Sequence, residues 1–425
     1  MDKISSKIKK IKGQIVIPPD KSISHRTAMF AALTKGVVMI KNYSKGADCH
    51  STLNILKNLG CEITFHNEMD ITINAKKALT APHCDLNCGN SGTTMRMMSG
   101  ILAGQNFNST LFGDASLSKR PMKRIIQPLT LMGADFKHND FKAPLTVIGS
   151  KLSPITYNSP LASAQVKSAI LLAGLFADGI TTVNEPFQSR NHTELMLKYL
   201  EANIVENSKT STSIKKSELV PKDMEVCGDI SSAAFFMVAA AIVPNSEIII
   251  KNVGINETRS GIIDVFYRMN ANIEILNKRN ISGEDVADIK IAYSQLKATT
   301  IEGSEIPRLI DEIPVIAVLA TQAEGSTIIK DAADLRNKES DRISTIVSQL
   351  NSIGANVEET ADGMIIHGKT KLIGDKSIEC FHDHRTAMSF FVAGLICEKP
   401  LLVKDFQWVN TSFPEFEKLM SSVIS

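Results

Sequence analysis

Apolar residues gather in runs that recur at intervals of about 65–80 residues along the chain. Drawn as a helix, each run is apolar on nearly all sides, and a helix without a polar face is expected to be buried all round. A short stretch rich in Val, Ile and Thr, typical of a strand, follows each run. Six such helices are predicted, over 25–36, 92–104, 164–179, 230–246, 310–325 and 384–399.

A second kind of helix, amphipathic and ending in a small-residue turn before a strand, alternates with the first. Its last copy has apolar residues at i, i+3, i+4, i+7 and i+10 from Ile343, which form one helical face. The turn suits a helix C-cap. Pro128 falls inside one copy and is expected to kink or restart that helix. The turns are centred on Gly60, Gly133, Glu201, Asn270 and Gly354.

The two series divide the 425 residues into six units of about 70 residues. Each unit is predicted to hold one buried helix, one amphipathic helix and three or four short strands. The alternative is a generic α/β protein whose helices happen to have similar lengths. Because two interleaved series agree along the whole chain, a repeated α/β unit is favoured.

The composition is that of a globular chain of two or three domains. With 47 Lys+Arg against 45 Asp+Glu, the net charge is +2, which argues against a nucleic-acid partner. The N-terminal stretch lacks the apolar core of a signal peptide, and the longest apolar run, Ala233 to Val243, is too short for a membrane span. The seven cysteines show no paired spacing, so reduced thiols and a cytoplasmic protein are expected.

The near-neutral total conceals cations at the starts of predicted helices, beside small polar residues. Free N–H groups at a helix start, together with hydroxyls and a guanidinium or ammonium group, form an anion site. A single segment of this kind is often a plain N-cap, but six indicate a cleft that gathers several anionic groups. They cover 18–26, 88–96, 113–124, 163–167, 335–342 and 381–385.

The signatures of several other chemistries do not occur in the sequence. It contains no GxxxxGK[ST], GxGxxG, HExxH or GxSxG motif, so nucleotide cofactors are not indicated. His382, Asp383 and His384 could be read as metal ligands. Without a third clear ligand, a hydrogen-bonded helix start is favoured there. No cofactor and no metal are expected.

Nine segments, in order along the chain, resemble motifs of the 5-enolpyruvylshikimate-3-phosphate synthase family of enolpyruvyl transferases. They are DKSISHR, GNSGTTMR, SKRPM, ASAQVKSAILLAG, RNHTE, GDISSAAF, IDEIP, RNKESDRI and DHRTAM. The resemblance implies an α/β fold of two inside-out α/β barrel domains, each with three βαβαββ-type repeats around buried helices. The domains would be 1–19 with 228–425, and 20–227, with the active site in the cleft between them.

The reaction that the resemblance implies transfers the enolpyruvyl group of phosphoenolpyruvate to the 5-hydroxyl of shikimate 3-phosphate and releases phosphate. It belongs to chorismate and aromatic amino-acid biosynthesis and is the target of glyphosate. Both substrates carry a carboxylate and a phosphate, which suits cations at helix starts. The enol carbon is protonated, the hydroxyl attacks and phosphate leaves, so an acid and a base must exchange roles.

Matching positions receive roles from the resemblance. Lys21 would touch both substrates and help to protonate the enol carbon. Asp311 would be the base at the 5-hydroxyl, because a carboxylate among cations stays ionised, and Glu339 would make the second proton transfer. Shikimate 3-phosphate would be held by Lys21, Ser22, Arg26, Ser163, Gln165, Asp311 and Lys338, and phosphoenolpyruvate by Lys21, Gly92, Arg120, Gln165, Arg342 and Arg385.

Simpler interpretations of some residues stay open. Glu339 could be only an i,i+3 partner of Arg342, and Arg342 and Arg385 could form surface ion pairs. Further cations are expected to support the site as a second line behind the substrate-binding residues. They are Arg96, Arg124, Lys167, Arg190 and His192.

Three other functions compete with this one. UDP-N-acetylglucosamine enolpyruvyl transferase carries a reactive cysteine in the loop before an Arg-Pro dipeptide, and the loop GDASLSKRP has none. An RNA 3′-phosphate cyclase-like protein would need a histidine nucleophile and a basic surface. An inactive anion-binding relative is opposed by the presence of Lys21, Asp311, Glu339 and Arg385. The expected protein is a monomer that binds small substrates and neither nucleic acid nor membrane.

Overall fold

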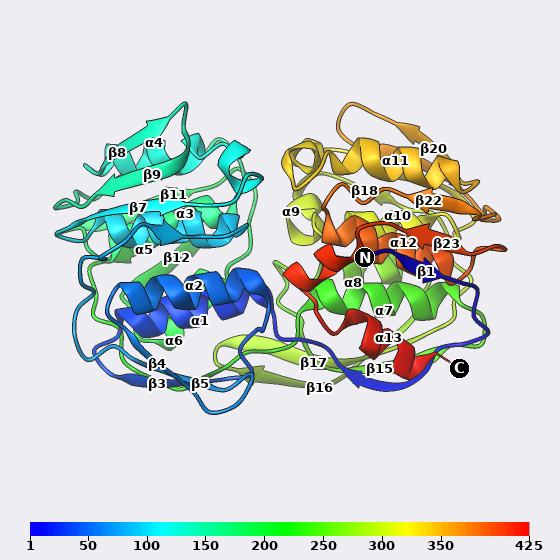
Figure 1. The fold of residues 1–425 in the computed structure, drawn as a ribbon, viewed down its shortest axis with the longest axis horizontal. Helices are drawn as coiled ribbons and strands as arrows, with labels where there is room; N and C mark the ends of the chain where they lie inside the picture. The colour runs from blue at the N-terminus through cyan, green and yellow to red at the C-terminus, as the bar shows by residue number, and fades with distance from the viewer. Residues whose placement is uncertain (425) are drawn as a thin grey trace. The chain divides into compact units, whose positions relative to one another are not determined.

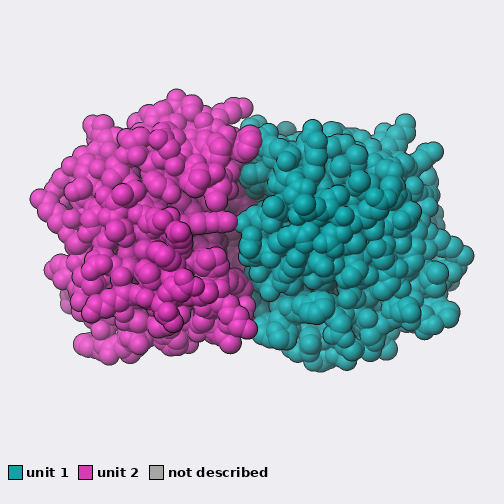
Figure 2. Space-filling model, turned by 90° about the horizontal axis from the view of Figure 1, so that it is seen from above, with its two compact units in different colours: residues 1–18, 228–279, 285–425 teal, residues 19–227, 280–284 magenta. Residues whose placement is uncertain are grey.

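The computed structural model describes residues 1–424 and divides the chain into two compact units (Figures 1 and 2). Unit 1 comprises Met1–Pro18, Gly228–Arg279 and the chain from Asp285 onward. Unit 2 comprises Pro19–Cys227 and the short segment Asn280–Glu284. That segment surrounds the turn of a β-hairpin, so residues distant in sequence complete unit 2.

Two sheets of unit 2 are built from consecutive βαβαββ segments. In each, the first two strands pair in parallel and the others antiparallel, giving the orders β6-β7-β9-β8 and β10-β11-β13-β12. The first segment contains β6 (Leu86–Asn87), α3 (Gly92–Ala103), β7 (Asn108–Phe112), η1 (Leu117–Lys119), α4 (Lys123–Leu131), β8 (Asp135–Asn139) and β9 (Lys142–Ile148). The second contains β10 (Thr156–Asn158), α5 (Ala164–Gly174), β11 (Ile180–Asn184), α6 (His192–Tyr199), β12 (Ile204–Ser208) and β13 (Ser211–Lys215).

The third sheet of unit 2 is closed by a strand from elsewhere in the chain. Its order is β14-β3-β5-β4, with β14 parallel to β3. β14 takes the place of the first strand of the βαβαββ pattern, although it follows the other repeats of unit 2 in the sequence and comes just before the chain returns to unit 1. The elements are α1 (Lys21–Leu33), β3 (Val37–Lys41), α2 (Ala47–Asn58), β4 (Glu62–Phe65), β5 (Ile71–Asn74) and β14 (Met224–Glu225).

Unit 1 repeats the same plan, with sheet orders β16-β17-β15-β2, β18-β19-β21-β20 and β1-β23-β22. The first sheet goes with β2 (Lys12–Val16), α7 (Ile230–Ile242), β15 (Glu247–Gly254), α8 (Gly261–Arg268), β16 (Asn272–Ile281) and β17 (Glu284–Ala292). The second goes with β18 (Thr300–Ile301), η2 (Gly303–Glu305), α9 (Ile306–Leu309), α10 (Ile313–Ala320), β19 (Gly325–Ile329), η3 (Ala333–Asn337), α11 (Arg342–Ser352), β20 (Asn356–Glu359) and β21 (Met364–Gly368). The third goes with β1 (Lys3–Ser5), β22 (Lys376–Ile378), α12 (His384–Gly394), β23 (Leu401–Val403), η4 (Phe406–Thr411) and α13 (Phe416–Val423).

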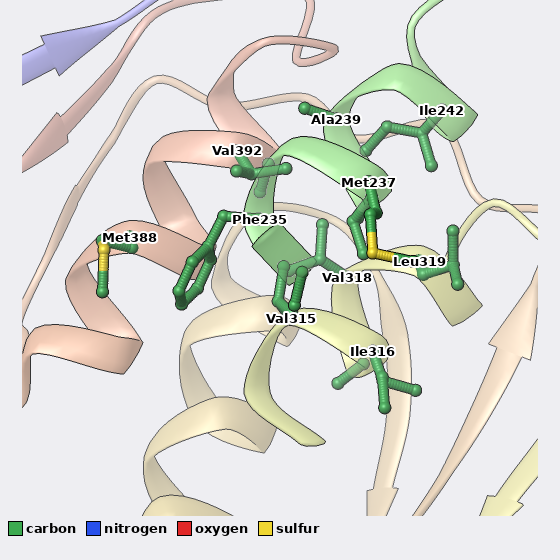
Figure 3. Close-up of a cluster of buried hydrophobic side chains, with 14 of the residues drawn as sticks. Phe235, Met237, Ala239, Ile242, Val315, Ile316, Val318, Leu319, Met388 and Val392 are labelled. Carbon is green, nitrogen blue, oxygen red and sulfur yellow. The ribbon is translucent and has the colours of Figure 1, made fainter. Parts of the chain in front are cut away.

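The apolar helices form the core of each unit, as their sequences predict. All residues of α7 and α10 are buried, and α7, α10 and α12 pack on one another. Figure 3 shows Phe235, Val315 and Val392 from these three helices within the same cluster. In unit 2, α3 packs against both α1 and α5. Burying such helices on every side removes a large apolar area from water and places their N-terminal ends at the edges of the core.

The predicted turns are confirmed, whereas the helix restart that was one of two effects expected at Pro128 is not found. All five turn residues have positive φ, from 60° at Asn270 to 98° at Gly133, which is the left-handed C-cap geometry. Pro128 neither ends nor restarts its helix, because α4 continues through it. Proline removes only the N–H that would reach the carbonyl of Arg124, four residues earlier in the first turn of this short helix.

The predicted helix bounds shift at both ends. The helix expected over 25–36 begins four residues earlier, at Lys21, and the one expected over 310–325 is confined to Ile313–Ala320, leaving Asp311 outside any helix. The six sheets and the two compact units agree with the predicted two-domain α/β fold of repeated units. Within residues 1–424, no helix has the length and apolar character needed to cross a membrane.

Candidate active site

In unit 2, the start of α1 presents the cations predicted from the sequence. Asp20 caps the helix by accepting a hydrogen bond from the Ile23 N–H at 2.9 Å. This cap places Lys21 in the first turn, where its Nζ lies 3.0 Å from the Asp48 carboxylate of α2. Asp48 was not anticipated, because nothing in the sequence places α2 beside this turn. The carboxylate holds the flexible lysine in one position.

Arg26, about one turn further along α1, is almost fully buried and is joined to two other helices and to the start of its own helix. Its guanidinium donates to Thr193 Oγ1 at 2.8 Å, to Ser168 Oγ at 2.9 Å and to the Ser22 carbonyl at 2.9 Å. Burial lowers the pKa of Arg26 to about 10, although Glu194 acts in the opposite direction. The side chain is therefore still charged at neutral pH and contributes a fixed positive charge next to Ser22.

The start of α3 has the geometry of an anion site around Gly92. Ser91 caps the helix by accepting from the Thr94 N–H at 3.1 Å. A Cβ on residue 92 would lie 2.7 Å from Nη1 of Arg96 and 3.5 Å from Nη1 of Arg120. A side chain at residue 92 would collide with Arg96, so glycine lets the two guanidinium groups lie close to the N–H groups of the helix start.

The start of α5 is joined to the start of α3. The side-chain oxygen Oε1 of Gln165 accepts from Arg96 Nη1 at 2.7 Å, and Nε2 of Gln165 donates to Thr93 Oγ1 at 3.0 Å. Ser163 is the N-cap residue of α5, yet its hydroxyl makes no capping hydrogen bond. The substrate-binding residues predicted in unit 2 therefore lie at or near the starts of helices that pack on one another, α3 against both α1 and α5. We call them the unit 2 cluster: Lys21, Ser22, Arg26, Gly92, Arg120, Ser163 and Gln165.

A buried hydrogen-bond chain connects the start of α1 with that of α3. His25 Nδ1 lies 2.7 Å from Thr52 Oγ1, which lies 2.8 Å from Thr94 Oγ1, which in turn contacts the Ser91 cap. His25 Nε2 is buried without a hydrogen-bond partner among the described residues. Burial, and then the charges of Lys21 and Arg26, lower the pKa of His25 well below its usual value. His25 is therefore neutral at physiological pH.

We expect His25 to make folding stability depend on pH below about 6.5. The unfolded chain takes up a proton there that the folded chain excludes, so stability falls as pH decreases, by at most about 1.4 kcal/mol per pH unit from this group. His25→Gln should remove that contribution while still offering Thr52 a hydrogen-bond partner. Urea unfolding of both proteins between pH 5 and pH 8 measures it. Identical pH slopes for the two proteins would contradict this prediction.

Unit 1 gathers the remaining predicted residues, which we call the unit 1 cluster: Asp311, Lys338, Glu339, Arg342 and Arg385. Asp311 lies between α9 and α10, and its carboxylate is 3.4 Å from Arg342 Nη1 and 3.8 Å from both Lys338 Nζ and Arg259 Nη1. Arg385, in the first turn of α12, donates to the Asp311 carbonyl at 3.0 Å. An acidic group surrounded by cations is thus set at the end of two buried helices.

Arg342 is the most heavily paired cation of the unit 1 cluster. Its Nε lies 2.7 Å from Asp383 Oδ2 and its Nη2 lies 2.7 Å from Glu339 Oε2. Burial alone would lower the pKa of Arg342, but Asp383 and Glu339 outweigh it and raise the pKa. Arg342 and Arg385 are 1% and 7% exposed, so the surface ion-pair interpretation is wrong for both. The i,i+3 contact between Glu339 and Arg342 is present.

Asp383 has a different role from that of a metal ligand. It caps α12 by accepting from the Arg385 N–H at 2.9 Å and holds Arg342 with the same carboxylate. His382 stacks on Trp408, with ring centroids 4.7 Å apart. No group of three or more potential metal-binding side chains occurs anywhere in residues 1–424.

Two buried residues near Asp311 were missed from the sequence. Arg259 Nη2 lies 2.6 Å from Ser231 Oγ and 3.2 Å from Asp229, while Glu312 contacts Ser231 and lies 3.4 Å from Arg259 Nη1. Arg259 stands directly before Ser260 and the start of α8, the same cation-and-hydroxyl pattern that identified the other segments. That signal could have found it. For Glu312, the sequence offers no signal beyond its position next to Asp311.

Comparisons with known proteins agree with the motifs. A profile of the family EPSP synthase (3-phosphoshikimate 1-carboxyvinyltransferase) matches residues 5–420. The 3-phosphoshikimate 1-carboxyvinyltransferases of Bacillus licheniformis and Thermodesulfovibrio yellowstonii are both 50% identical, the first over 96% of each chain and the second over 99% of each.

Solved structures give the same result. An EPSP synthase from Acinetobacter baumannii superposes with a TM-score of 0.90 at 40% identity, covering 100% of this chain and 98% of that one. The enolpyruvyl transferase NikO from Streptomyces tendae has a TM-score of 0.81 at 15% identity, covering 99% and 96%, which shows the fold alone. The family expected from the nine motifs is confirmed, and the chain belongs to the EPSP synthase (3-phosphoshikimate 1-carboxyvinyltransferase) family.

Proposed function

We propose that this protein transfers the enolpyruvyl group of phosphoenolpyruvate to the 5-hydroxyl of shikimate 3-phosphate and releases phosphate. The observation that carries the proposal is the 50% identity to 3-phosphoshikimate 1-carboxyvinyltransferases over nearly the whole chain. The unit 2 and unit 1 clusters support it, since helix starts, guanidinium groups and an ammonium group suit two substrates that each carry a phosphate and a carboxylate.

Within unit 2, we assign the binding of both substrates to adjacent helix starts. Ser22, Arg26 and Ser163 would hold shikimate 3-phosphate, with the Ser163 hydroxyl available because it does not cap α5. Gly92 and Arg120 would hold the phosphate of phosphoenolpyruvate, because residue 92 has no side chain between the helix start and the guanidinium groups. Lys21 and Gln165 would contact both substrates.

Within unit 1, we assign the remaining groups to the same pair of substrates. Lys338 would bind shikimate 3-phosphate, while Arg342 and Arg385 would bind phosphoenolpyruvate. These cations already contact acidic side chains, as in the pair of Arg342 with Glu339. An incoming anion would therefore compete with Glu339 for Arg342, which would free the glutamate for proton transfer.

The proposed reaction has two steps. Asp311 takes the proton of the 5-hydroxyl as its oxygen attacks C2 of phosphoenolpyruvate, and Lys21 assists protonation of C3, which yields a tetrahedral intermediate. In the second step the C–O bond to phosphate breaks and Glu339 removes a proton from the new methyl group, restoring the enol double bond. Fixed cations stabilise the charge that develops on the departing phosphate. That the enzyme acts as a cytoplasmic monomer stays a prediction.

Phosphate release tests this proposal. With phosphoenolpyruvate present, we expect release to be about a hundredfold or more faster with shikimate 3-phosphate than with UDP-N-acetylglucosamine. Lys21→Ala serves as the control, because a contaminating activity would persist in that variant. Equal rates with both acceptors, or release independent of any acceptor, would exclude the proposed function.

A further inference from the structure

Close to Ser163, unit 2 buries a group of four charged side chains, of which only Arg26 has a proposed contact with a substrate. Lys167 Nζ lies 2.7 Å from Glu194 Oε1 and 3.0 Å from Glu185 Oε2, and all three side chains are at most 3% exposed. Arg26, the fourth, is influenced electrostatically by Glu194. We call Arg26, Lys167, Glu185 and Glu194 the buried quartet; its two cations and two carboxylates balance.

Glu185 connects this quartet to the substrate-binding turn. One of its oxygens, Oε1, accepts the Ser163 N–H at 3.1 Å. The other, Oε2, accepts the Ser189 hydroxyl at 2.9 Å and faces Lys167. Lys167 also donates to the Ser189 carbonyl at 3.3 Å. Glu185 is therefore held in one orientation by a neighbouring ammonium group and a neighbouring hydroxyl, and its remaining oxygen fixes the backbone of Ser163.

This contact holds the backbone of Ser163 and is distinct from the capping hydrogen bond that a serine side chain makes at a helix start. A serine at an N-cap ordinarily uses its hydroxyl to accept a helix N–H. Ser163 makes no such bond. Its position is instead fixed by the hydrogen bond from its backbone N–H to Glu185. The hydroxyl then stays available at the start of α5, where Arg26 is also tied to the same helix through Ser168.

The energetics of burial favour a role beyond stability. Removing charges from water costs so much that a buried ion-pair network contributes little net stability compared with well-packed apolar residues. What such a network supplies is one defined geometry, because each charge must keep its partners. Burial would lower the pKa of Lys167, but Glu194 and Glu185 raise it above its usual value, so the lysine remains charged.

We propose that Glu185, oriented by Lys167, is a positioning residue that sets the Ser163 backbone so that its hydroxyl binds the phosphate group of shikimate 3-phosphate. The proposal rests on the proposed function for its substrate. It predicts a selective effect: weakened binding of the phosphorylated acceptor with little change in phosphoenolpyruvate binding. Gly92 and Arg120 lie on other segments, and Gln165, although close to Ser163, is held by its own hydrogen bonds to Arg96 and Thr93.

The test compares Glu185→Ala with Glu185→Gln and with the exposed variant Lys216→Met, whose lysine pairs with Asp178 on the surface of the same unit. For Glu185→Ala we expect the KM for shikimate 3-phosphate to rise about tenfold, the size of one charge-assisted hydrogen bond. The KM for phosphoenolpyruvate and kcat should stay within about twofold. Glu185→Gln keeps an acceptor for the Ser163 N–H and should show a smaller rise, and Lys216→Met none.

Amide hydrogen exchange of Ser163 provides a readout that does not need turnover. It should be faster in Glu185→Ala than in wild type and intermediate in Glu185→Gln. Should the alanine variant fail to fold, the glutamine variant alone must show both effects. Unchanged exchange at Ser163, or KM values for both substrates rising together, would overturn the proposal. A wild-type enzyme inactive with shikimate 3-phosphate would instead refute the proposed function, while the exchange result would still decide whether Glu185 fixes Ser163.

Discussion

Replacing Asp311 by asparagine should lower kcat by about 10²- to 10⁴-fold, the usual contribution of a general base. Asparagine keeps the shape and can still accept hydrogen bonds from the surrounding cations, but it cannot take the proton of the 5-hydroxyl. Three cations lie within 3.8 Å of the Asp311 carboxylate. In the variant they would lose a negative charge beside them, but the space around them would stay filled. The KM for shikimate 3-phosphate should therefore change much less than kcat.

Steady-state kinetics with both substrates varied separates these two effects. Asp264→Asn is a matched control, because it removes a carboxylate from an exposed ion pair with Arg308 in the same unit, and its kcat should equal that of wild type. If Asp311→Asn retained kcat within tenfold of wild type, Asp311 would not be the base.

The fold could be predicted from sequence wherever an element's own residues determine its environment. α7 is apolar on all sides, so it had to be buried whatever surrounds it. The turn residues at Gly60, Gly133 and Gly354 adopt positive φ because the local pattern demands it. The break before α10, which frees Asp311 from the helix, was missed because Ile310 and Ile313 flank it and continue the apolar pattern.

Candidate site residues could be predicted where they belong to helix starts with several polar residues in succession. The acidic residues that hold them in place could not be predicted from the sequence. Asp48 reaches Lys21, and Glu185 reaches Ser163, only through the packing of other helices and loops. Lys167 was expected to be a second-line cation for the substrates, yet the structure pairs it with two buried carboxylates. A long-range partner leaves no pattern in a single sequence, since it depends on how distant segments pack.

Replacing Arg342 by methionine should have the largest combined effect on stability and activity. The side chain is 2% exposed and is shared by Asp311, Glu339 and Asp383. Methionine fills a similar volume but leaves these carboxylates without their common cation. Breaking a buried ion pair from one side costs about 3–5 kcal/mol, because the remaining charge is uncompensated. The proposed binding of phosphoenolpyruvate would also lose one guanidinium group, so its KM should rise at least about tenfold.

Two further variants show which part of the loss comes from uncompensated charge. In Arg342→Met combined with Asp383→Asn, one of the stranded carboxylates is neutral, so part of the lost stability should return while phosphoenolpyruvate binding stays weak. Lys399→Met breaks an exposed pair with Asp375 and should cost at most about 1 kcal/mol. Urea unfolding measures the loss of stability, and the KM for phosphoenolpyruvate measures the loss of binding. If Arg342→Met alone were as stable as Lys399→Met, Arg342 would not hold the unit 1 cluster together. Recovery of phosphoenolpyruvate binding in the double variant would show that Arg342 acts on the substrate only through Asp383.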